Sequence, residues 1–138
     1  MSTLRELSGD GLPLIAHIPG QATAGTADEF VVGVAPFKGK VVRVDWIPKA
    51  AVTANATNFF TLNVRNRGQV DGTGATNVAA RSYAATNSVA WVRETATLNA
   101  TAANRNVAAG DVLTVEKVNT ASGLAMPQGT VIVWIRPA

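Results

Sequence analysis

Short runs of alternating apolar and polar residues, each ended by turn-forming residues, constrain the fold of this chain most strongly. Between residues 39 and 48, Val42, Val44 and Trp46 alternate with polar residues until Pro48 ends the run. A period of two residues is typical of a half-buried β-strand. No segment shows a convincing helical period. The pattern predicts about eight strands, over residues 14–18, 29–34, 39–48, 60–65, 78–83, 89–98, 112–118 and 130–136.

The composition agrees with an all-β fold. Ala, Val and Thr supply 57 of the 138 residues, and charged residues supply only 15%. Small and β-branched side chains suit pleated, half-buried surfaces. Strands separated by turns, without helices between them, favour antiparallel sheets packed face to face. We therefore expect an antiparallel β-sandwich, jelly-roll-like, in which residues 130–136 form a central strand because both of their faces are apolar.

The beginning of the chain differs from the rest, because Gly and Pro interrupt every possible element there. We expect residues 1–27 to form an extended N-terminal arm and residues 28–138 to form a single β-sandwich domain. A segment broken in this way cannot easily bury its own apolar side chains. The arm's apolar residues are therefore expected to become buried only on assembly; they are Leu4, Leu12, Leu14, Ile15 and Ile18.

The chain lacks the residue patterns of most catalytic and metal sites. It has no cysteine and one histidine, His17, which excludes thiolate chemistry and metal cages rich in His or Cys. None of the serines stands in a nucleophile motif. The loop at residues 71–76 has neither the acids of a calcium loop nor the ending of a phosphate-binding loop. We expect no enzyme, no cofactor, no metal and no small-molecule substrate. Two carboxylates from distant strands can also hydrolyse glycosides, so the sequence does not exclude a catalytic pair among the acidic residues, although no spacing favours one. The candidates are Asp45, Glu94, Asp111 and Glu116.

Charge and hydropathy argue against a nucleic-acid or membrane partner. The net charge of +3 arises from 12 basic and 9 acidic residues, with no basic run. Basic residues cluster only around the expected strand at residues 39–48, and we interpret them as a solvated face. No apolar stretch approaches the ~20 residues that span a bilayer, and the N-terminus lacks the apolar core of a signal peptide. We expect a soluble protein.

The tryptophans are expected to divide between core and surface. Trp46 shares its face with Val44, which favours burial. Trp91 shares its face with Arg93 and Thr95, which makes it the better candidate for an exposed contact.

The order of these features resembles the decoration proteins of tailed-phage capsids, the jelly-roll cement proteins of phage heads. After the Gly- and Pro-broken arm, the resemblance is carried by FKGKVVRVDWIP at 37–48 and TNFFTLNVRN at 57–66. It continues with AAGDVLTV at 108–115 and TVIVWI at 130–135, and covers roughly residues 30–138.

The resemblance implies a structural virion protein rather than an enzyme. It implies many copies, often homotrimers, that are made in the host cytoplasm and bind the major capsid protein on the outer surface of the expanded capsid. There they clamp neighbouring subunits. The arm and exposed strand faces would make the contacts, and we add Trp91 to the candidate contact residues.

Other functions are compatible with the same sandwich. A carbohydrate- or receptor-binding module of a phage head fibre or tail could use Trp91, Tyr83 and the loop at residues 71–77 as its binding face. A cupin-type enzyme is disfavoured, because His17 alone cannot supply its metal ligands. A major capsid subunit is conceivable, although the chain is short for that role.

Overall fold

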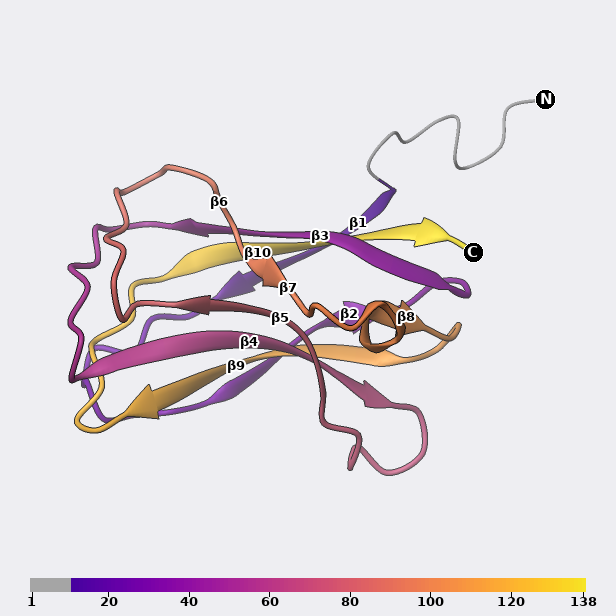
Figure 1. Cartoon of the computed structure of the whole chain (residues 1–138), viewed down its shortest axis with the longest axis horizontal. Coiled ribbons are helices and arrows are strands. Elements are labelled where there is room, and N and C mark those ends of the chain that lie inside the picture. Colours follow the sequence, from indigo (N-terminus) through magenta and orange to yellow (C-terminus); the bar gives the residue numbers. More distant parts are fainter. Residues whose placement is uncertain (1–10) are drawn as a thin grey trace.

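The computed structural model describes residues 11–138, which form two antiparallel β-sheets packed face to face (Figure 1). The first, which we call the β10 sheet, contains in spatial order β1 (Leu12–Ile18), β10 (Gly129–Pro137), β3 (Gly39–Pro48) and β6 (Glu94–Thr95), and β8 (Asn106–Val107) also pairs with β3. The second, the β9 sheet, contains β2 (Glu29–Val34), β9 (Val112–Thr120), β4 (Phe59–Gly68), β5 (Thr76–Ser82) and β7 (Thr97–Leu98). A 3₁₀ turn, η1 (Ala102–Arg105), lies between β7 and β8.

The strand pairing is that of a jelly roll. The first described strand pairs with the last, β2 pairs with β9, β3 with β6 and β8, and β4 with β5. Each pair is nested inside the one before it, as in a long hairpin that is folded over into two layers. The expected antiparallel jelly-roll sandwich is therefore confirmed, with ten strands rather than about eight.

The core lies between the two sheets and is built from the alternation seen in the sequence. Trp46 is only 2% exposed, as expected, and the rings of Phe60 and Tyr83 pack beside it with their centroids 4.6 Å apart. The expected central position of the last strand is also confirmed, because β10 lies between β1 and β3.

A bulge in β3 corrects the expected facing of one residue. Val41 pairs with Ile135 and Arg43 pairs with Trp134, so Val42 has no partner on β10. An extra residue of this kind shifts the alternation by one position. Val41 therefore shares the buried side with Val44, whereas Val42 is only half-buried.

The expected strand at residues 89–98 is wrong. Only β6 and β7 form there, and they pair with different sheets, β6 with β3 and β7 with β5. The chain crosses from one sheet to the other at Ala96, whose N–H donates to the carbonyl of Val44 (2.8 Å). Residues 90 and 91 form a turn instead of a strand.

The expected arm at residues 1–27 also needs correction, because residues 12–18 are a strand of the β10 sheet. Every residue of β1 has a partner on β10, from Leu12 opposite Ile135 to Ile18 opposite Gly129. Most of the Gly and Pro residues flank this strand, and Pro13 is tolerated because β1 lies at a sheet edge.

We expect Trp46→Ala to lower the free energy of unfolding by about 3 to 5 kcal/mol, because it leaves a large cavity between the sheets. Trp91→Ala is the matched control and should change stability by less than about 0.5 kcal/mol, since Trp91 is exposed. Urea denaturation of both variants checks this. A loss below about 1 kcal/mol for Trp46→Ala would contradict its place in the core.

Candidate functional site

The most exposed apolar cluster at one end of the sandwich is a turn between β5 and β6. Val89, Trp91 and Val92 are 63%, 68% and 49% exposed. We call residues 89–92 the tryptophan turn. Its backbone is held by two hydrogen bonds: Trp91 N–H donates to the Pro48 carbonyl (2.8 Å) and Val92 N–H to the Val89 carbonyl (3.3 Å). The expected exposure of Trp91 is thus confirmed.

Trp91 has an unusual backbone conformation. Its φ angle is 66°, in the left-handed region that a bulky residue rarely adopts. Such a conformation costs on the order of 1–3 kcal/mol and persists only where the surrounding structure fixes it. A large apolar side chain that is both exposed and held in a costly conformation is a candidate for contact with a partner.

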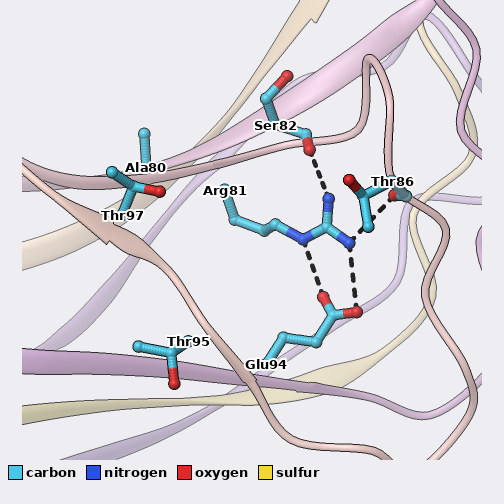
Figure 2. A pocket seen from close by; sticks show the side chains of 7 residues that line it. All are labelled: Ala80, Arg81, Ser82, Thr86, Glu94, Thr95 and Thr97. Carbon is cyan, nitrogen blue, oxygen red and sulfur yellow. Dashed lines mark hydrogen bonds and ion pairs between the residues drawn. The ribbon is translucent and has the colours of Figure 1, made fainter.

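An ion pair behind the turn fixes its two ends. The Arg81 guanidinium at the end of β5 donates to both carboxylate oxygens of Glu94 in β6, from Nε to Oε1 (2.9 Å) and from Nη2 to Oε2 (3.2 Å) (Figure 2). Arg81 also donates to the carbonyls of Ser82 and Thr86. This fork, which we call the Arg81–Glu94 clamp, therefore joins the strand before the turn to the strand after it.

A chain of hydrogen bonds connects the clamp to the core. The Ser88 hydroxyl donates to Glu94 Oε2 (2.6 Å) and lies 2.5 Å from the Tyr83 hydroxyl, which accepts from Trp46 Nε1 (2.9 Å). The Arg81 guanidinium carbon lies 3.9 Å from the centre of the Tyr83 ring. Burial raises the pKa of Tyr83 and keeps its hydroxyl neutral.

The clamp borders an open pocket of about 380 Å³ whose other lining residues include Thr86, Thr95 and Thr97 (Figure 2). The charges at this pocket are already paired with each other and with backbone carbonyls. The clearest effect of the Arg81–Glu94 clamp is structural, because the clamp positions the tryptophan turn. Sequence reasoning missed the clamp, since its partners are 13 residues apart; the one signal was the acidic Glu94 on the apolar side of an expected strand.

The structure separates the other candidate contact residues. Leu4 lies outside the described residues. Ile18 is 1% exposed and belongs to the core, so the expectation that it becomes buried only on assembly is wrong. Leu12 and Leu14 are half-buried, and Leu14 packs against the core. Ile15 lies on the outer side of the β10 sheet and is 63% exposed in the single chain.

The residues of the expected sugar-binding face do not come together. Tyr83 is fully buried, with its hydroxyl bonded inside the protein. The loop at residues 71–75 precedes β5, whereas the tryptophan turn follows β5, so the two lie at opposite ends of that strand (Figure 1). Asp71 accepts from the backbone N–H (3.1 Å) and hydroxyl (2.7 Å) of Thr73, as in a simple polar turn.

Each of the candidate carboxylates is bonded to protein partners of its own. Asp45 accepts from Arg43, Thr95 and Trp134, and Asp111 accepts from Asn66, Gln69 and the Ala108 N–H. Glu94 lies in the clamp, and Glu116 pairs with Arg65 and Arg67.

His17 is exposed on β1. Among residues 11–138, no three His, Cys, Asp or Glu side chains are grouped as metal ligands, and no helix there is long and apolar enough to cross a membrane.

The outer face of the β9 sheet carries a second ionic cluster. Glu29 on β2 accepts from both Nε and Nη2 of Arg67 on β4, and from the hydroxyl of Thr114 on β9. Glu116 lies beside them and accepts from Arg65 (3.2 Å). The Arg67 hydrogen bonds lower the pKa of Glu29 from 4.5 to about 2, although its partial burial acts in the opposite direction.

Comparison with known proteins assigns no family. No protein-family model and no curated protein matches the chain. Among solved structures, the chain is similar to one in the structure of infectious bursal disease virus strain Gx, with 10% sequence identity and a TM-score of 0.29. The match covers 91% of this chain and 37% of the viral chain. A likeness at this level assigns neither family nor function.

The Glu29 cluster makes stability depend on acid pH. Because the folded pKa lies below the unfolded one, the contribution of Glu29 is complete above about pH 4.5 and is lost as pH falls towards about 2. Glu29→Gln should be less stable than wild type by roughly 1 kcal/mol at pH 6, because it loses a solvent-screened ion pair. This difference should shrink between pH 4.5 and pH 2 when both are unfolded with urea; a difference that stays constant across that range would contradict the assignment.

Proposed function

We propose that this chain is a structural protein of a phage particle that binds the outer surface of the expanded capsid and stabilises it by clamping neighbouring capsid subunits. Two features support the proposal. The jelly-roll pairing is the fold that the sequence resemblance implied. The tryptophan turn is an exposed, conformationally fixed apolar contact of the kind that anchors protein interfaces.

The observation that carries the proposal is the combination of exposure, strain and bracing at Trp91. An exposed tryptophan on a mobile loop would lose conformational freedom on binding, which weakens affinity. Here the Arg81–Glu94 clamp and the Pro48 carbonyl already fix the turn. Trp91 is therefore prepared for a complementary pocket on a capsid subunit.

Capsid stabilisation would follow from mass action. A ligand that binds the assembled, expanded lattice but not its separate subunits stabilises that lattice, by an amount that grows with the logarithm of the ligand concentration above the Kd. A protein that contacts more than one subunit at a time has this selectivity. The three-fold assembly that the resemblance implies stays a prediction, as does any contribution from residues 1–10.

The first test is binding of the purified protein to expanded heads that lack it. We expect saturable binding and an increase in the temperature at which the heads release their DNA. Binding to unexpanded heads or to free capsid subunits should be much weaker. Binding to glycans and not to heads would instead favour a receptor-binding module.

Trp91→Ala should weaken binding to expanded heads by roughly tenfold or more, because aromatic anchors dominate interface energies. Val70→Ala is the matched control, since Val70 is 96% exposed on the loop before β5, away from the turn. Co-sedimentation with heads measures both. If Trp91→Ala folds normally and binds as wild type does, the tryptophan turn is not the capsid contact.

A deletion that tests the arm has to stop at residue 10. The removal of residues 1–20 would also remove β1, which pairs along its whole length with β10, and would damage the sheet itself.

A further inference from the structure

The two sides of the sandwich differ in the length of their edge strands. β6, β7 and β8, at the edges near the tryptophan turn and η1, are two residues long each. Such short edges offer little to another strand. On the opposite side the edges are β1, with seven residues, and β2, with six. The structure describes no strand beyond either of them among residues 11–138.

These two long edges carry exposed aliphatic side chains. Ile15 of β1 is 63% exposed, and Val31 and Val34 of β2 are 65% and 52% exposed. The two strands lie on the same side of the sandwich, because the Leu14 side chain of β1 lies over Gly33 of β2, 3.5 Å from the position of a Cβ atom there. The open side therefore exposes aliphatic side chains in both layers, next to the paired charges of Glu29 and Arg67 in the second layer.

β2 is protected and β1 is not. The pairing of β2 with β9 shifts its register between Val31 and Gly33, which leaves Val32 as a bulge. Bulges and charged side chains are the usual means of blocking an edge strand. β1 keeps one register with β10 from Leu12 to Ile18 and contains no Asp, Glu, Lys or Arg.

The hydrogen bonds of the neighbouring strands show which residues of β1 turn their backbone outward. In an antiparallel sheet, successive residues bond to opposite neighbours. The Val44 carbonyl of β3 accepts from Ala96, away from β10, so the next residue, Asp45, bonds to its partner Ile132 on β10. The N–H and C=O of Ile132 thus point towards β3 and not towards β1. Ile15, which lies opposite Ile132 on β1, therefore points its own N–H and C=O away from β10, towards the free edge.

The same parity holds along β1, so Pro13 and His17 also face outward. Pro13 has no N–H, and proline is tolerated at an edge position whose N–H would point away from the sheet. The free edge of β1 thus offers the N–H groups of Ile15 and His17 and the carbonyls of Pro13, Ile15 and His17.

We propose that β1 is a self-association site, at which a second copy of this chain adds its own β1 in antiparallel orientation about a two-fold axis at Ile15. Ile15 is the middle residue of the strand, so this register gives the longest overlap. Each Ile15 N–H meets the Ile15 carbonyl of the second copy, and each His17 N–H meets the second copy's Pro13 carbonyl. A register centred on Pro13 would place two residues without N–H opposite each other.

Charge favours a second copy as the occupant. Strand pairs with like charges directly opposite are destabilised, but β1 has no Asp, Glu, Lys or Arg that could meet its own copy. The two Ile15 side chains would pack against each other, and Val31 and Val34 of each copy would extend the contact in the second layer. Such an isologous contact closes on itself. The inference does not depend on the capsid proposal. A closed two-chain assembly and the three-fold assembly that the resemblance implies are alternatives, and the measurements below separate them.

Cysteine cross-linking tests the two-fold pairing directly, because the chain has no cysteine of its own. Hydrogen-bonded partners in an antiparallel pair have Cα atoms about 5.5 Å apart, within the range of a disulfide. Ile15→Cys should therefore cross-link to a two-chain product under mild oxidation. Val70→Cys is the control: the position is more exposed than Ile15, at 96% against 63%, and lies on the loop before β5, so this variant should stay monomeric under the same conditions.

Light scattering on the full-length protein gives the independent measurement. Wild type should have the mass of two 14.3 kDa chains at micromolar concentration. Ile15→Lys should dissociate at least about tenfold more readily, because it places two cations opposite each other, whereas Val70→Lys should not. Circular dichroism should show that both variants are folded.

Three results would overturn the proposal. One is a wild-type protein that is monomeric at about 100 μM, and another is a three-chain mass together with no Ile15→Cys cross-link. The third is a dimer that forms only when residues 1–10 are deleted, since the chain's own first residues would then cover the edge. None of these results bears on binding to heads, so the two proposals fail separately.

Discussion

The pairing of β1 with β10 is the constraint on which the rest of the structure depends. It joins residues 12–18 to residues 129–135, almost the whole length of the described chain. The pairs β2 with β9, β3 with β6 and β8, and β4 with β5 are nested inside this contact. The pairing makes β10 a central strand with two apolar faces and leaves β1 at the edge. Such long-range contacts are formed at a high cost in loop entropy, so we expect slow folding. The β1–β10 pairing thus accounts both for the central position of β10 and for the open edge at β1.

The two ends and sides of the sandwich are specialised in different ways. The Arg81–Glu94 clamp fixes the tryptophan turn from inside, through Ser88 and Tyr83 to Trp46 in the core. Stability of the core and presentation of Trp91 are thus connected by one hydrogen-bonded chain. The outer face of the β9 sheet is covered by the paired charges around Glu29 and Arg67. The β1 edge itself has no Asp, Glu, Lys or Arg and no bulge, and it is the edge at which we propose that a second strand adds.

Alternation predicted most strands, because long strands with one buried face repeat every two residues. It failed at residues 89–98, where β6 and β7 are too short to show a period and pair with different sheets. It also failed at Val42, because a bulge leaves no composition signal. Alternation did predict a strand at residues 14–18, which is confirmed as part of β1; the assignment of residues 1–27 to an arm was wrong, because the pairing of residues 12–18 with β10 is visible only in three dimensions. The expected exposure of Trp91 is confirmed, but it arises from a turn and not from the strand face that predicted it. Its strain and the clamp behind it could not be predicted, since both arise from contacts between residues distant in sequence.

The central claim is that this chain belongs to the surface lattice of a phage particle. Quantitative mass spectrometry of virus particles purified from the source of this chain tests the claim most directly, by comparing the copy number of the chain with that of the major capsid protein. The account predicts a ratio near one or a fixed simple fraction, because a lattice protein occupies equivalent sites over the whole shell. A few copies per particle, or none, would contradict it.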